Sequence, residues 1–90
     1  MPTKHLLIKG KVQGVFFRAT AKDVAEKLGL TGWVRNTVEG DVEAMATGSA
    51  EQLQSFVDWC HQGPSRAHVT SVIATDREEE KFTGFKIIRG

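Results

Sequence analysis

The chain has 90 residues, of which 40% are hydrophobic and 26% charged. These values are typical of a soluble globular protein, and the length fits a single domain spanning residues 1–90. The formal net charge of +1 excludes a global field that would attract nucleic acid or a membrane. The one cysteine, Cys60, excludes an internal disulfide and a multi-cysteine metal cluster. The sequence shows no signal-peptide core and no apolar run of membrane-spanning length, so we expect a cytoplasmic location.

The first half of the chain predicts a strand, a helix and a hairpin. Residues 5–10 include three consecutive apolar side chains, as in a strand that is buried on both faces. Apolar residues then recur at helical spacing from residue 17 to residue 28, and Gly29 stands where a left-handed residue ends a helix. Residues 30–37 and 41–47 flank a glycine-containing turn, which predicts a hairpin with one face exposed to water.

The second half predicts one more helix and one more strand. Ser49 begins a capping box with the glutamine three residues later, and the helix that follows ends at Gly63. Residues 69–75 are largely β-branched and predict a strand. Residues 76–81 are mostly charged, so we expect a solvated connecting loop before residues 82–89 close the chain.

Two helices that each connect strands predict an α+β fold, the ferredoxin-like split βαβ sandwich (βαββαβ). Both helices pack on one face of an antiparallel sheet in this fold. The first and third strands lie side by side at the centre, and the second strand flanks the third. The loop after the first strand then lies at one end of the sheet, and the other face of the sheet stays open.

The loop between the first strand and the first helix has the parts of an anion cradle. It reads Gly10-Lys11-Val12-Gln13-Gly14-Val15-Phe16-Phe17-Arg18. Its glycines allow consecutive N–H groups to turn inward, and the following helix adds its N-terminal partial positive charge. Arg18 supplies planar, charged donors for two oxygens at once. The spacing fits neither a nucleotide P-loop nor a dinucleotide fingerprint, and on spacing alone a simple strand-to-helix turn is the better explanation.

Blocks of sequence along nearly the whole chain resemble the acylphosphatase family. They are Gly10-x-Val12-Gln13-Gly14-Val15-x-Phe17-Arg18, Gly29-Leu30-x-Gly32-Trp33-Val34-Arg35-Asn36-x-x-Glu39-Gly40-x-Val42-Glu43, Gly63-Pro64-x-x-Ala67-x-Val69 and Phe85-x-Ile87. The resemblance implies the same ferredoxin-like fold. It also implies hydrolysis of the carboxyl-phosphate bond of small acyl phosphates.

The resemblance implies roles for particular residues. Arg18 binds the phosphoryl oxygens, and Asn36 holds and orients the attacking water. The phosphate-binding backbone N–H groups are those of Gln13, Gly14, Val15, Phe16, Phe17 and Arg18. Glu39 stands where many relatives have aspartate, in a turn where we expect the change to leave the chemistry unaffected.

These residue types suit attack by water on an acyl phosphate. Phosphoryl transfer passes through a loose transition state, so positioning and charge stabilisation supply most of the catalysis. The leaving carboxylate is a weak base that needs little protonation, and an amide suffices to hold the water. We therefore expect direct in-line attack, with no phosphoenzyme, no metal and no cofactor.

The expected partner is a small acyl phosphate, with inorganic phosphate or sulfate as a ligand of the same site. Candidates implied by the family include acetyl phosphate, carbamoyl phosphate and 1,3-bisphosphoglycerate. We expect a monomer that binds neither nucleic acid nor membrane. The three histidines, His5, His61 and His68, lack metal-like spacing and are interpreted as surface or edge residues. Cys60 lies on an apolar helix face and is interpreted as a small core residue.

Two other functions compete with hydrolysis. An open ferredoxin-like sheet can stack RNA bases on exposed aromatic side chains. The predicted third strand, residues 41–47, has no aromatic residue and two acids, which disfavours that function. A catalytically silent domain, of the kind found within larger proteins, is compatible with the same motifs, although the complete pair of long motifs disfavours it.

Overall fold

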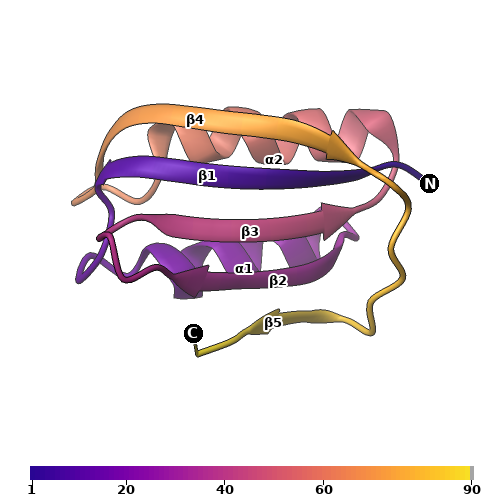
Figure 1. Cartoon of the computed structure of the whole chain (residues 1–90), viewed down its shortest axis with the longest axis horizontal. Coiled ribbons are helices and arrows are strands. Elements are labelled where there is room, and N and C mark those ends of the chain that lie inside the picture. Colours follow the sequence, from indigo (N-terminus) through magenta and orange to yellow (C-terminus); the bar gives the residue numbers. More distant parts are fainter. Residues whose placement is uncertain (90) are drawn as a thin grey trace.

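The computed structural model describes residues 1–89, which form one five-stranded sheet covered on one face by two helices (Figure 1). The strands are β1 (Thr3–Lys11), β2 (Thr31–Asn36), β3 (Val42–Thr47), β4 (His68–Arg77) and β5 (Phe85–Ile87), and the helices are α1 (Phe17–Lys27) and α2 (Ala50–Gln62). The strand order is β4-β1-β3-β2-β5. The ferredoxin-like fold is confirmed, with β1 and β3 at the centre and β2 beside β3.

The sheet is mixed, and the prediction of a wholly antiparallel sheet is wrong in its last strand. The first four strands pair antiparallel, whereas β5 pairs parallel with β2, with Phe85 opposite Gly32. Phe85 is 3% exposed, and its ring packs edge-on against Phe56 with 5.8 Å between ring centroids. Burial of this ring and backbone hydrogen bonds with Gly32 and Val34 together hold the closing segment against β2. A three-residue strand is too short to show the alternation by which strands are predicted.

The segment between β4 and β5 is anchored to the sheet by its backbone. β4 continues beyond residues 69–75 to Arg77, so part of the expected loop is strand. Farther along, the N–H of Glu80 donates to Thr3 Oγ1 at 3.0 Å, and its carbonyl accepts from Thr47 Oγ1 at 2.7 Å. The side chains of this segment are exposed as predicted, but the connection is fixed where it crosses the end of the sheet (Figure 1).

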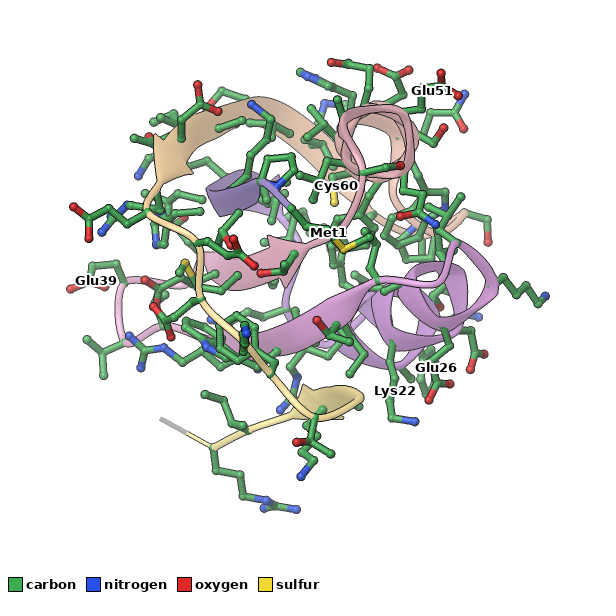
Figure 2. The ribbon with its side chains drawn as sticks, turned by 90° about the vertical axis from the view of Figure 1, so that its right-hand side faces the viewer. Met1, Lys22, Glu26, Glu39, Glu51 and Cys60 are labelled. Atoms are coloured by element: carbon green, nitrogen blue, oxygen red, sulfur yellow. The ribbon has the colours of Figure 1, made fainter. Side chains whose placement is uncertain are left out.

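Both helices end at the predicted residues and bury the predicted faces. Ser49 and Gln52 form a complete capping box at the start of α2. Gly29 and Gly63 follow the two helices with φ values of 77° and 66°, conformations that glycine adopts without strain. Cys60 is fully buried between α2 and the sheet (Figure 2), and burial raises the pKa of its thiol. No helix within residues 1–89 has both the length and the apolar character that crossing a membrane requires.

Burial on the open face of the sheet differs from the prediction in β1 and in β3. β1 buries Leu6 and Ile8 toward the helices, whereas Leu7 is only half-buried on the open face, so the prediction of burial on both faces is wrong for this strand. In β3, Met45 and Thr47 on the open face are each 7% exposed. Thr47 is covered by the anchored connection, which could not be predicted because it depends on a backbone far away in the sequence.

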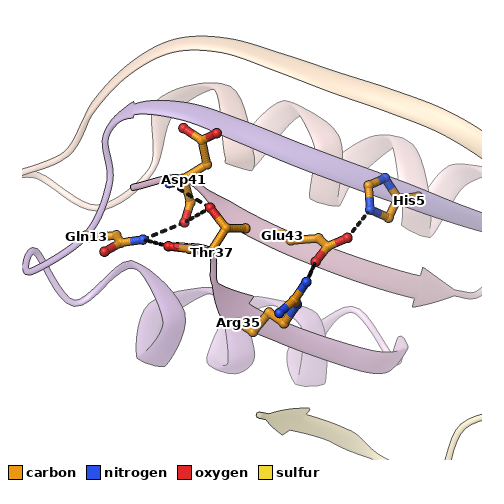
Figure 3. Close-up of polar contacts among 6 residues, drawn as sticks. All are labelled: His5, Gln13, Arg35, Thr37, Asp41 and Glu43. Carbon is orange, nitrogen blue, oxygen red and sulfur yellow. Dashed lines mark hydrogen bonds and ion pairs between the residues drawn. The ribbon is translucent and has the colours of Figure 1, made fainter. Parts of the chain in front are cut away.

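His5 is not a surface or edge residue, because it lies on the central strand β1 and its side chain is 18% exposed. Its Nε2 lies 2.6 Å from one carboxylate oxygen of Glu43, and Arg35 donates to the other oxygen, also at 2.6 Å (Figure 3). Burial raises the pKa of Glu43, but the hydrogen bonds with His5 and Arg35 and the charge of Arg35 outweigh that effect. The pKa of this carboxyl therefore lies below its ordinary value.

This lowered pKa predicts a pH-dependent contribution to stability. A carboxyl whose pKa is lower in the folded than in the unfolded state stabilises the fold at neutral pH and loses that contribution on acidification. We expect Glu43→Gln to lower the free energy of unfolding by about 1 kcal/mol at pH 7. The difference in free energy of unfolding between the variant and the unmodified protein should shrink once the pH falls below 4.5, the ordinary pKa of a glutamate carboxyl.

Urea denaturation measures the free energy of unfolding of the variant and of the unmodified protein at neutral and at acidic pH. Glu26→Gln is the matched control, because Glu26 pairs with Lys22 on the exposed surface of α1 (Figure 2) and such pairs contribute little. A deficit for Glu43→Gln that is the same at both pH values would contradict the assigned role.

Candidate active site

Three segments that are distant in the sequence meet at one end of the sheet, on the left in Figure 1. They are the loop after β1, the last residue of β2 and the end of β5. Because β2 and β5 are parallel, their carboxyl ends lie at the same edge. This convergence brings together Arg18 and Asn36, the two residues expected to be catalytic, which line the same two adjoining hollows.

The backbone of the loop is bent, and its N–H groups from Gln13 to Arg18 have no acceptor within residues 1–89. Gly14 has a φ of 73°, and Phe16, with a φ of 64°, is the only non-glycine residue among residues 1–89 in this left-handed region. Within the same residues, no acceptor bonds the backbone N–H groups from Gln13 to Arg18. Consecutive unpaired donors around left-handed residues form an anion-binding concavity. The loop therefore has the geometry of the expected cradle.

The N-terminus of α1 strengthens the positive character of this loop. The residue preceding the helix, Phe16, makes no side-chain capping bond, and the first turn contains no acidic residue. The first N–H groups of a helix carry a partial positive charge. Arg18 is half-buried in this first turn, and no carboxylate within residues 1–89 forms a salt bridge with it. Its charge thus adds to that of the helix terminus.

The side chain of Gln13 fixes the loop to the hairpin that carries Asn36. Its Nε2 donates to the carbonyls of Thr37 and Asp41, each at 2.8 Å (Figure 3). Thr37 and Asp41 also bond each other, because the N–H of Thr37 donates to the Asp41 carbonyl at 2.9 Å and the N–H of Asp41 donates to Thr37 Oγ1 at 3.1 Å. The family resemblance implied only a backbone role for Gln13. Nothing local signals its side-chain role, because the partners lie more than twenty residues away in the chain.

The two hollows lie on opposite sides of the sheet edge and share Arg18, Asn36 and Arg89. The first, which we call the loop hollow, is about 420 Å³ in volume and is also lined by Gly14, Phe16, Phe17 and Ile87. The second, the sheet hollow, is about 610 Å³ and extends over the open face along Leu7, Val38, Ile88 and the His5–Glu43–Arg35 cluster. Four of the residues with unpaired N–H groups, Gly14, Phe16, Phe17 and Arg18, line the loop hollow, whereas only Arg18 lines the sheet hollow, so the loop hollow suits an anion better.

Arg89 is a third arginine at this site and was not among the residues predicted from the sequence. It lines both hollows although it is distant in sequence from Arg18 and Asn36. It comes near them because β5 adds to the edge of β2, a pairing that the sequence does not predict. Within residues 1–89 no group of three or more His, Cys, Asp and Glu side chains could hold a metal ion. The donors that converge here are N–H groups and guanidinium groups, which suit an oxyanion.

These features define a ferredoxin-like α+β protein in which N–H and guanidinium donors suited to an oxyanion meet at one end of the sheet. The model of the acylphosphatase family matches residues 4–87. The acylphosphatase of Marinobacter nauticus is 49% identical over 83 residues, which cover 91% of this chain and 90% of that protein. The chain belongs to the acylphosphatase family, and thus to the hydrolases that act on acyl phosphates.

Solved structures agree with this membership. The acylphosphatase of Coxiella burnetii superposes with a TM-score of 0.94 at 38% identity, covering 97% of this chain and 92% of that one. The acylphosphatase of Bacillus subtilis also gives a TM-score of 0.94, at 37% identity, covering 98% of this chain and 99% of that one. The family resemblance inferred from the sequence motifs is confirmed.

The Gln13 contacts predict that its side chain maintains the anion site. We expect Gln13→Ala to weaken the binding of inorganic phosphate about tenfold, because losing two hydrogen bonds costs on the order of 1–2 kcal/mol. The inhibition constant of phosphate, measured by competition, reports the change. Gln54→Ala is the matched control, since Gln54 bonds only Asp58 on the exposed face of α2. A lowered melting temperature with unchanged phosphate binding would show that Gln13 supports only the fold.

Proposed function

We propose that this protein hydrolyses the carboxyl-phosphate bond of small acyl phosphates, giving a carboxylate and inorganic phosphate. The observation that carries the proposal is the set of unpaired N–H groups from Gln13 to Arg18 next to the unpaired guanidinium of Arg18. Together they offer the hydrogen-bond donors and the positive charge that bind the oxygens of a phosphoryl group at neutral pH. Family membership identifies the phosphoryl compound as an acyl phosphate.

In this mechanism the loop and Arg18 bind the non-bridging oxygens of the phosphoryl group. The loose transition state of phosphoryl transfer spreads charge over these oxygens, and donors fixed in advance stabilise that charge without reorganising. The Gln13 contacts hold the loop in place, so the donors are aligned before substrate arrives. Arg18 lies beside them in the first turn of α1 and supplies the permanent positive charge.

Asn36 holds the water that attacks phosphorus in line with the departing carboxylate. The new bond forms between the water oxygen and phosphorus, and the bond between phosphorus and the carboxyl oxygen breaks. The carboxylate leaves with the electron pair of that bond, and a phosphoryl oxygen accepts the proton of the water. A neutral amide is sufficient for this role, because its carbonyl accepts a hydrogen bond from the water and its NH₂ group donates to an oxygen.

The side chains around the two hollows support direct attack by water. The residues lining them include no serine or cysteine. Thr37, the one hydroxyl residue, accepts a hydrogen bond from the N–H of Asp41. His5 lies in the sheet hollow and is held by Glu43. No phosphoenzyme, metal or cofactor enters this mechanism.

We further propose that one copy of the chain forms the complete site. Arg18, Asn36 and the loop belong to the same chain, and β4 and β5 pair with strands from its first half, which supports a single-domain monomer spanning residues 1–90. Inorganic phosphate or sulfate is the expected site ligand. We place the protein in the cytoplasm, with no affinity for nucleic acid or membrane. The acyl phosphate that the protein hydrolyses in the cell is a small acyl phosphate, the class to which acetyl phosphate belongs.

The rival functions have less support in the structure. An RNA-binding sheet requires exposed aromatic rings on its open face. There, Trp33 is half-buried, and the guanidinium of Arg35 lies 6.0 Å from the centre of its ring. A silent interaction domain would need none of the unpaired donors in the loop. An activity assay therefore separates it from the enzyme.

The direct test mixes the purified protein with acetyl phosphate and with benzoyl phosphate in the presence of a chelator. We expect rapid loss of both compounds, because the site uses no metal ion. No acceleration over buffer in either mixture would overturn the proposed function. Activity that appears only without the chelator would overturn the metal-free mechanism.

Substitutions of Arg18 and Asn36 should affect phosphate binding and turnover differently. Arg18→Gln removes the charge that grips the phosphoryl group, so we expect weaker phosphate binding and a loss of turnover of about 10²–10³-fold. Asn36→Ala removes only the water holder, so turnover should fall about 10²-fold while the inhibition constant of phosphate stays nearly unchanged. Steady-state kinetics with phosphate as a competitive inhibitor separates the two effects. A large loss of phosphate binding in Asn36→Ala would contradict the role given to this residue.

A further inference from the structure

Phe16 has an exposed side chain at a position where a large ring is costly to place. Its side chain is 74% exposed although the residue lies between the buried Val15 and Phe17. Its backbone has a φ of 64° and a ψ of 23°, a conformation that costs an L-residue about 1–2 kcal/mol and glycine almost nothing. Strained residues of this kind concentrate at functional sites.

The anion cradle explains the backbone of Phe16 but not its side chain. The left-handed conformation belongs to the bend in which the N–H groups from Gln13 to Arg18 have no acceptor within residues 1–89, and glycine at this position would adopt it without strain. The ring contributes no hydrogen bond to the phosphoryl group. It does line the loop hollow together with Gly14, Arg18 and Asn36. The ring is therefore placed to contact whatever is attached to the phosphoryl group.

Ile87 supplies a second apolar surface in the same hollow. It is opposite Val34 in the pairing of β5 with β2, and Val34 is fully buried on the face covered by the helices. Ile87 itself is 40% exposed and lines the loop hollow. The sheet hollow differs in character, because half-buried charged groups of the His5–Glu43–Arg35 cluster form much of its wall. Most residues that line the loop hollow are apolar, and Phe16 and Ile87 among them are exposed, so this hollow can bind hydrocarbon beside the phosphoryl site.

We propose that Phe16 and Ile87 bind the hydrocarbon part of the acyl group and make the protein selective for acyl phosphates with aromatic or branched acyl groups. This inference rests on the proposed function, because it assigns the other end of the same substrate. The phosphoryl group lies on the unpaired N–H groups, and the acyl group extends along the two apolar side chains within the same hollow of about 420 Å³. Acetyl phosphate, with a single methyl group, gains little from this surface.

The test compares kcat/KM for benzoyl phosphate with kcat/KM for acetyl phosphate in each variant. We expect Phe16→Ala to lower the benzoyl-to-acetyl ratio about tenfold relative to the unmodified protein, and Ile87→Ala to lower it by a smaller factor. Phe16→Gly should lower the ratio as much as Phe16→Ala, because it also removes the ring while relieving the backbone strain. The inhibition constant of inorganic phosphate should stay nearly constant in Phe16→Gly, which separates loss of the ring from damage to the cradle.

Val38→Ala is the matched control, because Val38 is 97% exposed and lines only the sheet hollow. Its benzoyl-to-acetyl ratio should equal that of the unmodified protein. A lowered ratio in Val38→Ala with an unchanged ratio in the Phe16 variants would place the acyl group in the sheet hollow and overturn the proposal. An unchanged ratio in all variants would overturn it as well. Neither result affects the proposed function, which fails only if the unmodified protein hydrolyses neither compound.

Discussion

The pair of hydrogen bonds from Gln13 to the hairpin is the contact on which the site depends. Gln13 lies in the loop that offers the anion donors, and Asn36 directly precedes Thr37, one of the two carbonyl partners of Gln13. Without this connection the loop and the hairpin would be joined here only through the sheet. With it, the loop proposed to bind the phosphoryl oxygens and the hairpin that carries the residue proposed to hold the water are joined directly by hydrogen bonds. Fixed relative geometry of this kind is the main contribution that a protein makes to phosphoryl transfer.

The hydrophobic core supports the strained part of the same loop. Phe17 directly follows the left-handed Phe16, is 2% exposed and packs against Trp59 with 5.2 Å between ring centroids. Val15, on the other side, is 5% exposed. Two buried neighbours thus hold the chain at both ends of the strained residue. Burial of large side chains gives more than enough free energy to offset a strain of about 1–2 kcal/mol.

Features that depend on local patterns were predicted well from the sequence. Helix spacing, the capping box at Ser49 and the glycines after both helices identified the elements and their ends, because these signals involve residues close together in the chain. The strand order of the first four strands followed from the βαββαβ pattern. The family motifs identified Arg18 and Asn36, and the structure places both residues around the same two hollows. Their catalytic roles remain proposals.

Features that depend on distant pairings were missed. The strand at Phe85 exists because one ring reaches the core, and Arg89 joins the site only because of that strand. The contact of His5 with Glu43 requires two central strands in register. The bonds of Gln13 with Thr37 and Asp41 likewise join segments that only the fold brings together. None of these contacts has a spacing or composition that a single sequence reveals.

The N–H groups from Gln13 to Arg18 are proposed to bind the phosphoryl group. Titration of isotope-labelled protein with inorganic phosphate, followed amide by amide by nuclear magnetic resonance, tests this proposal most directly. The largest chemical-shift changes should occur at the backbone amides from Gln13 to Arg18 and at the side-chain amide of Asn36. The changes should all follow a single binding curve. Changes centred on the open face around His5 and Glu43, with the loop amides unaffected, would contradict the account.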